Sequence, residues 1–119
     1  MVVGLNKVIV IGQVGRAPEM RFVPSGRAVT SFSVSVTRDW VDLDGGQHDE
    51  TEWFNVVVWD ALADLCKQRL VRGSTVYIEG QLHTRTWEDE NGTSCFCVEL
   101  MAQDVVPLCE PGGDEGTAG

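Results

Sequence analysis

Three of the four tryptophans stand in strand-like sequence beside polar or charged residues, a pattern suited to holding flat, negatively charged ligands. Trp53 and Trp59 are six residues apart in "TEWFNVVVW", so a β-strand places both on one face together with Asn55. Trp87 follows Arg85 at a spacing of two, which puts an indole beside a guanidinium. Indole faces stack on nucleobases of any identity while nearby cations attract phosphates. A second interpretation stays open, in which the rings fill a subunit interface or cover the fold.

Other chemistries find less support in the sequence. Cys95 and Cys97 lie two apart and could in principle hold a metal or form a redox pair, but no histidine or second cysteine pair accompanies them, which favours idle thiols. His48 and His83 are isolated and suggest no nucleophilic catalysis. The acids cluster in expected loops, whereas a two-metal nuclease needs rigid strands. We therefore expect no catalytic residue, no metal and no cofactor, and we expect a protein that is not an enzyme.

Taken alone, the formal net charge of -9 argues against a nucleic-acid partner. Twelve of the eighteen acids, however, lie in three short segments: six in residues 39–52, three in 88–90 and three from residue 110 onward. The remaining six acids face nine lysines and arginines, so the rest of the chain is mildly basic. The acidic segment 39–52 is expected to be a solvated hairpin tip, and repulsion of duplex phosphates is the functional alternative.

Composition also indicates the cellular compartment of the protein. The 119 residues fit one domain, no apolar run approaches the roughly 20 residues of a membrane helix, and the first residues lack a signal-peptide pattern. The four cysteines match neither a disulfide framework nor a common zinc pattern, so we expect reduced thiols. A cytoplasmic protein is expected.

Alternation of apolar and polar residues predicts five strands, over residues 7–14, 27–38, 51–59, 75–87 and 94–106. The first is apolar on both sides and is expected to be covered on both faces, with Gly12 marking a bend or a close backbone approach. "GRAPEM" and "VPSG" are expected to be turns. The side chains expected to face the core from the other strands are Phe32, Val34, Val36, Phe54, Val56, Val58, Val76, Ile78, Leu82, Phe96, Val98 and Leu100.

One helix is predicted over residues 61–72, with Asp60 as its cap and Gly73 after its end. Its expected apolar face consists of Leu62, Leu65, Cys66 and Leu70. Five strands with a helix between the third and fourth is the element order of the OB-fold, an all-β five-stranded Greek-key barrel. We expect this domain to span residues 1–106 and to be followed by a short disordered tail, residues 107–119.

Four segments make the sequence recognisable: "LNKVIVIGQVGRAPEMRF", "PSGRAVTSFSVSVTR", "TEWFNVVVW" and "GSTVYIEGQLHTRTW". In this order and spacing they resemble the bacterial single-stranded DNA-binding protein (SSB) family, along residues 5–106. The resemblance implies an OB-fold that assembles as a homotetramer and wraps single-stranded DNA without strict sequence preference. It also implies a role in DNA replication, recombination and repair, at the bacterial nucleoid. The alternative is an OB-fold accessory or protein-interaction module with little DNA binding.

Carried over position by position, the resemblance implies base-stacking residues and phosphate-binding residues. The stacking residues would be Trp40, Trp53, Trp59 and Trp87. The phosphate contacts would be Arg21, Arg72 and Arg85, with Lys7 and Arg38 as second choices. Continued alternation would place Trp40 in the core with Val36, so only a bulge or the end of regular pairing would turn it outward, as the resemblance favours. At position 59 the family commonly has Phe, and Trp keeps the aromatic face.

The chain departs from the family pattern in its charges and at its end. His83 and Thr86 stand where the family tends to have basic residues, so we expect affinity to fall with salt less steeply than is usual. The family's acidic and hydrophobic tip, which recruits other enzymes, is not matched by "EPGGDEGTAG". Either the chain is truncated or this recruitment is lacking, and we expect DNA binding without confident docking of partners.

Overall fold

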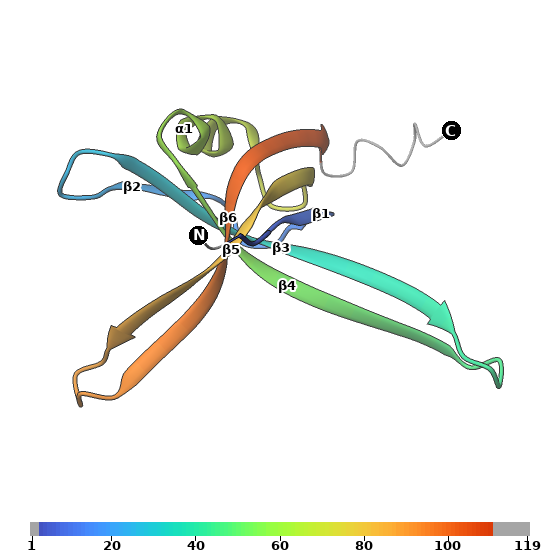
Figure 1. Ribbon diagram of the computed structural model, residues 1–119. Helices are drawn as coiled ribbons and strands as arrows, with labels where there is room; N and C mark the ends of the chain where they lie inside the picture. The colour runs from blue at the N-terminus through green and yellow to red at the C-terminus, as the bar shows by residue number, and fades with distance from the viewer. Residues whose placement is uncertain (1–2, 111–119) are drawn as a thin grey trace.

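The computed structural model describes residues 3–110, and nearly all of its regular structure is β (Figure 1). Seven elements follow one another along the chain. They are β1 (Val8–Val14), β2 (Glu19–Phe22), β3 (Ala28–Val41), β4 (Gln47–Trp59), α1 (Asp60–Arg69), β5 (Thr75–Glu88) and β6 (Ser94–Cys109). None of the described residues forms a helix with the length and apolar character of a membrane span.

The sheet closes on itself as a barrel of five strands. Its order is β1-β5-β6-β4-β3, with β2 added at the far side of β3, and β1 pairs with β3 as well as with β5. The closing contact is short, since only Gln13 and Val14 of β1 pair with Ser35 and Val34 of β3. Along the chain, helix α1 follows β4 and precedes β5, which are the third and fourth barrel strands in sequence order. The predicted OB-fold, with its five-stranded barrel and single helix, is therefore confirmed.

Two glycines allow strands to approach closely where the barrel bends. A Cβ atom on Gly12 would lie 2.2 Å from the carbonyl oxygen of Ser35, a separation that no side chain tolerates. Gly80 stands at a register shift between β5 and β6, and a Cβ there would lie 2.2 Å from the carbonyl oxygen of Met101. The close approach predicted for Gly12 is confirmed, and it lies next to the pairing that closes the barrel.

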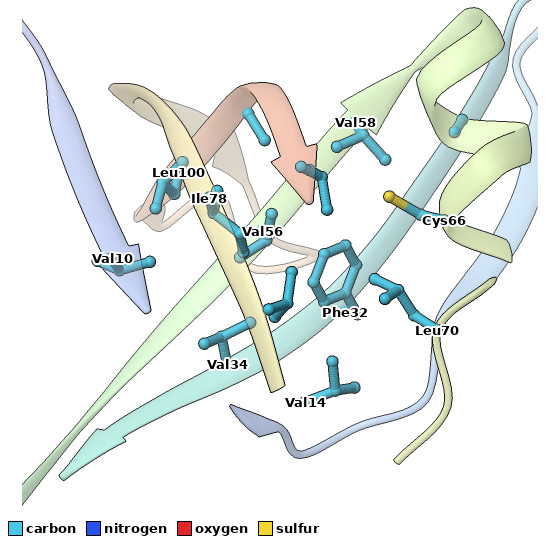
Figure 2. Packing of buried hydrophobic residues seen from close by; sticks show 14 residues of the cluster. Val10, Val14, Phe32, Val34, Val56, Val58, Cys66, Leu70, Ile78 and Leu100 are labelled. Atoms are coloured by element: carbon cyan, nitrogen blue, oxygen red, sulfur yellow. The ribbon is translucent and has the colours of Figure 1, made fainter. Parts of the chain in front are cut away.

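The core fills the barrel and the space between the barrel and α1 (Figure 2). Its side chains come from alternate positions of the strands, as a sheet with one covered face requires. Phe32, Val34, Val56 and Val58 are fully buried, which confirms the predicted inner faces of β3 and β4. Helix α1 adds Ala63 and Cys66, followed by Leu70 just after its end, and Thr30 donates a hydrogen bond of 2.8 Å to the carbonyl of Ala63.

Two hairpins extend well beyond the barrel as two-stranded arms (Figure 1). The β3–β4 ladder continues without a register shift to the pair Val41 and Gln47, and the β5–β6 ladder continues to Glu88 and Ser94. We call these the β3–β4 arm, residues 37–51, and the β5–β6 arm, residues 82–98. In both arms side chains still alternate, but neither face meets a core within the chain.

The arms overturn part of the predicted core. Leu82, Phe96 and Val98 were expected to point inward with Leu100, yet they are 43%, 72% and 47% exposed while Leu100 is 1% exposed. These three side chains do continue the core face of their strands. They are exposed because the strands have left the barrel by that point, so no helix or sheet lies opposite them.

Strand β1 is covered on one face only. Its inner face is buried at Val10 and Val14, whereas Ile9 and Ile11 are 54% and 55% exposed. The expectation that this strand is covered on both faces is therefore wrong for the single chain. Its outer face is an apolar surface that a second chain could cover.

Several predicted boundaries also move. Glu19 and Met20, expected to lie in the turn "GRAPEM", instead begin β2, because Glu19–Phe22 pairs with β3. Helix α1 begins at Asp60 and ends at Arg69, and the side chain of Asp60 binds Arg27 instead of capping the helix. Strand β6 continues to Cys109, three residues past the predicted end at 106. The remainder of the predicted tail, residues 111–119, lies outside the described residues.

Candidate nucleic-acid interface

The outer face of the barrel carries a groove across β2, β3, β4, β6 and β5, on the side opposite the core. Three arginines from separate segments line it: Arg16 after β1, Arg21 on β2 and Arg85 on β5. The groove has a volume of about 370 Å³. Its other lining residues are Val29, Ser31, Asn55, Val56, Val57, Cys97 and Glu99. A positively charged groove of this kind can follow the backbone of a single nucleic-acid strand.

Trp53 stands on this outer face at the base of the β3–β4 arm and is 62% exposed. Its ring lies against Gly15, where a Cβ atom would come within 2.4 Å of Cζ3. The backbone at Gly15 is fixed, because its N–H donates to the carbonyl of Ser33 and the next N–H donates to Ser33 Oγ, both at 2.8 Å. The indole is thus supported by a bare backbone beside its Cζ3 and Cη2 atoms, and most of Trp53 remains open to solvent.

Trp59 ends β4 on the same outer face and is half-buried. The guanidinium of Arg27 lies over its ring, with Cζ 4.6 Å from the centroid. Arg27 is held there by Asp60, whose carboxylate accepts two hydrogen bonds of 3.1 and 2.8 Å. This contact lowers the pKa of Asp60 below its ordinary value. Asp60 has φ of 59°, the only positive φ of a non-glycine residue among residues 3–110, so the carboxylate is placed by an uncommon backbone conformation.

Trp87 stands on the β5–β6 arm and is 42% exposed. Arg85, two residues before it on the same strand face, lies with Cζ 4.6 Å from the ring centroid. The Nε of Arg85 is 3.2 Å from Oε2 of Glu99 on the neighbouring strand. The pattern that drew attention to Arg85 and Trp87 therefore corresponds to a direct contact between them.

Trp40 is 37% exposed near the end of the β3–β4 arm. It stacks on His48, its partner in the ladder, with ring centroids 5.2 Å apart, and Arg38 lies 4.5 Å from its ring centroid. The expected outward position did not need a bulge, since pairing stays regular and the arm has simply left the barrel. Because positions 40 and 53 differ in parity along their paired strands, Trp40 and Trp53 lie on opposite faces of the ribbon.

The predicted phosphate contacts divide into two groups. Arg21 and Arg85 line the groove, whereas Lys7, Arg38 and Arg72 do not. Lys7 forms an ion pair of 3.3 Å with Glu79 of β5, and Arg38 forms one of 2.7 Å with Glu50. Arg72 is exposed in the turn after α1.

The backbone next to Arg72 is nevertheless bonded to the segment that supports Trp53. The N–H of Gly73, the next residue, donates to the carbonyl of Val14 at 2.7 Å, and Val14 precedes the Gly15 that supports the indole. Two further arginines, Arg16 in the groove and Arg27 over Trp59, were not predicted. A pattern within one strand could not have found them, because their positions depend on pairing between strands.

The cysteines and histidines form no recognisable metal centre. Among residues 3–110 there is no group of three or more His, Cys, Asp or Glu side chains placed to hold a metal ion. Cys97 lines the groove, with its Sγ 3.7 Å from the amide nitrogen of Asn55. Cys66 is buried against the core, and this burial raises the pKa of its thiol to about 12.

Comparison with known proteins agrees with this geometry. Residues 5–108 match the single-strand binding protein family. The chain is 39% identical over 116 residues to Single-stranded DNA-binding protein 1 of Chlorobaculum tepidum, an alignment covering 97% of this chain and 72% of that protein. The structure of this chain is similar to that of a chain in the Plasmodium falciparum SSB complex with ssDNA. The TM-score is 0.83 and the identity is 31%, and the alignment covers 91% of this chain and 98% of the other. The chain belongs to the single-strand binding protein family.

Proposed function

We propose that this protein binds single-stranded DNA without strict sequence preference, by stacking bases on tryptophans and contacting phosphates with arginines. The observation that carries this proposal is the groove with three arginines on the outer barrel face, flanked by indoles that remain open to solvent. Stacking suits any base, since every base has a flat π face, and a flexible single strand can expose its bases as a duplex cannot. Membership of the family supports the same function.

The residues take different places along such a strand. Trp53, Trp59 and Trp87 stand around the groove and would stack bases, while Arg21 and Arg85 contact phosphates, joined by Arg16. Trp40 and Arg38 lie farther out on the β3–β4 arm, so the strand reaches them only if it wraps around the arm. We propose that both residues contact DNA in this way.

Among the residues proposed to contact phosphates, Lys7 and Arg72 should contribute least to DNA affinity. Lys7 is paired with Glu79 on the β1–β5 side, and Arg72 stands beside the segment that supports Trp53. We retain both as secondary phosphate contacts. Substituting each with alanine should weaken binding less than substituting Arg21 or Arg85.

We further infer that copies of the chain assemble, as a homotetramer. The exposed Ile9 and Ile11 on the outer face of β1 support assembly, because contact with a second copy would remove this apolar strip from water. Sedimentation at several protein concentrations tests the oligomeric state.

The proposed place of action is the bacterial cytoplasm, at the nucleoid, in DNA replication, recombination and repair. We propose binding without catalysis, by a single DNA-binding domain that includes β6 and therefore extends at least to Cys109.

A titration tests the central proposal. Oligo-dT is added to the protein while tryptophan emission is followed, and stacked indoles should quench strongly; a duplex of equal length should bind much more weakly. The variants Trp53→Ala and Trp87→Ala should each weaken binding by about 1–3 kcal/mol, the contribution of one stacked base. An OB-fold interaction module, the second candidate, would leave the emission nearly unchanged. Shortening of the oligonucleotide on addition of magnesium would contradict the proposal that the protein acts without catalysis.

A further inference from the structure

Three of the four tryptophans share one arrangement, in which a carboxylate binds an arginine and that arginine lies over the indole. The guanidinium carbon is 4.5–4.6 Å from the ring centroid in all three. The carboxylate oxygen lies 2.7–3.2 Å from the arginine nitrogen. We call these the acid–Arg–Trp triads: Asp60–Arg27–Trp59, Glu50–Arg38–Trp40 and Glu99–Arg85–Trp87.

The arms build their two triads in similar ways. In each arm the arginine precedes the tryptophan by two residues on one strand, so both project from the same face. The acid comes from the paired strand: Glu50 lies directly opposite Arg38, and Glu99 lies diagonally from Arg85. The recurrence on two separate ribbons shows that strand pairing places the acid beside an arginine that already contacts an indole.

The third triad joins the ends of two elements. Arg27 immediately precedes β3 and Asp60 immediately follows β4, next to the paired residues Val29 and Trp59. The positive φ of Asp60 is the backbone feature that accompanies this contact. All three arginine side chains are more than half exposed, so a strand arriving from solvent can reach them.

A carboxylate presents a guanidinium with the same pair of acceptor oxygens that a phosphate presents. In the chain without DNA, each triad arginine therefore already has the kind of partner that DNA would supply. The arginine also covers one face of the indole, as a stacked base would. Glu99 is the best placed of the three acids, since it lines the groove together with Arg85 and its side chain is only 14% exposed.

We propose that Glu99, Glu50 and Asp60 act as internal substitutes for DNA phosphates, which the strand must displace from the triad arginines when it binds. This inference rests on the proposed function and adds three acids to the residues that determine affinity. An arginine that exchanges a carboxylate for a phosphate gains no net anionic partner. Counterion release at that phosphate is then partly cancelled by cation uptake at the freed carboxylate, which lowers the salt dependence of binding.

The test compares Glu99→Gln with the unmodified full chain in oligo-dT titrations at several salt concentrations. Glutamine keeps the size of the side chain and removes its charge, so Arg85 meets the phosphate without a competitor. The variant should bind more tightly at low salt, and its slope of log K against log salt should steepen by up to about 0.7. The ratio of the variant's binding constant to that of the unmodified chain should therefore fall by roughly 2.6-fold when salt is raised from about 50 to about 200 mM.

Two more variants make the result decisive. Asp60→Asn repeats the test at the triad beside Trp59, in case Glu99→Gln does not fold, and asparagine tolerates the positive φ of this position. Glu90→Gln removes the same charge from the turn of the β5–β6 arm. Glu90 forms no ion pair with any residue of the described range 3–110, so this variant measures the effect of net charge alone. The proposal is supported if the triad variants steepen the slope more than Glu90→Gln does. It is overturned if they weaken binding or leave the slope at the control value. Absence of binding by the unmodified chain would instead refute the proposed function.

Discussion

The contact between Gly15 and Trp53 allows a prediction in which a single methyl group changes DNA binding without harming the fold. In Gly15→Ala the new Cβ would lie 2.4 Å from Cζ3 of the indole and 2.9 Å from Cη2. Ordinary van der Waals contact between carbon atoms begins near 3.4 Å, so the ring or the backbone must retreat by about 1 Å. Two hydrogen bonds to Ser33 hold the backbone, and the ring therefore moves.

The structure also limits the size of the effect. Because Trp53 is 62% exposed, displacing its ring removes little buried contact, and folding stability should change by less than about 1 kcal/mol. Stacking of one base contributes about 1–3 kcal/mol, and a tilted or shifted platform should lose roughly half of it. The expected loss in oligo-dT affinity is thus about two- to twelvefold, against roughly 5- to 150-fold for Trp53→Ala.

The assay is a set of fluorescence titrations with thermal melts of the same samples. Gly4→Ala is the matched control, since nothing lies within 4 Å of a Cβ atom at that position. If Gly15 acts only through the indole, adding Gly15→Ala to Trp53→Ala should weaken binding no further. Equal affinity of Gly15→Ala and the control, while Trp53→Ala binds weakly, would refute the proposed role of this contact; so would full additivity of the two changes.

Three further outcomes concern the barrel itself. Phe32→Ala should lower the free energy of unfolding by about 3–5 kcal/mol in urea denaturation, because the ring is fully buried in the core; a loss below about 1 kcal/mol would contradict that packing. Gly12→Ala should destabilise the fold far more than Gly15→Ala in thermal melts, since its Cβ would meet the carbonyl of Ser35 at 2.2 Å, and equal melting temperatures would argue against this closure. Iodoacetamide near pH 8 should spare Cys66 in the folded protein, because a pKa raised to about 12 leaves almost no thiolate, whereas the three part-exposed cysteines should react first; Cys66 labelling at their rate would show that the thiol is not buried.

Alternation along the chain predicted the inner face of the barrel but not where the barrel ends. Val34 and Val56 were correctly assigned to the core, since each strand has one covered face there. Phe96 and Val98 follow the same alternation and are exposed, because the pattern carries no information about which element lies opposite a strand. The short strand β2 was missed because its pairing partner, not its own composition, makes it a strand.

The site was predictable where it depends on one strand and not where it depends on two. Parity alone placed Trp53 on the outer face and joined Arg85 to Trp87. The position of Arg27 over Trp59 could not be predicted, because it depends on the register between β3 and β4 and on the backbone of Asp60. The same limit hid the acids of the triads, each of which reaches its arginine across paired strands or between their ends.

The two arms have a consequence for how such a chain can change over generations. Beyond the barrel, a ladder can gain or lose whole pairs of residues without disturbing the core, because no buried side chain depends on its length. Side chains on a strand alternate with a period of two. Insertions of two residues on each strand would keep Trp40 and Trp87 on their present sides, while insertions of one would turn them to the opposite side. Arm length is therefore open to evolution in even steps, independently of the barrel.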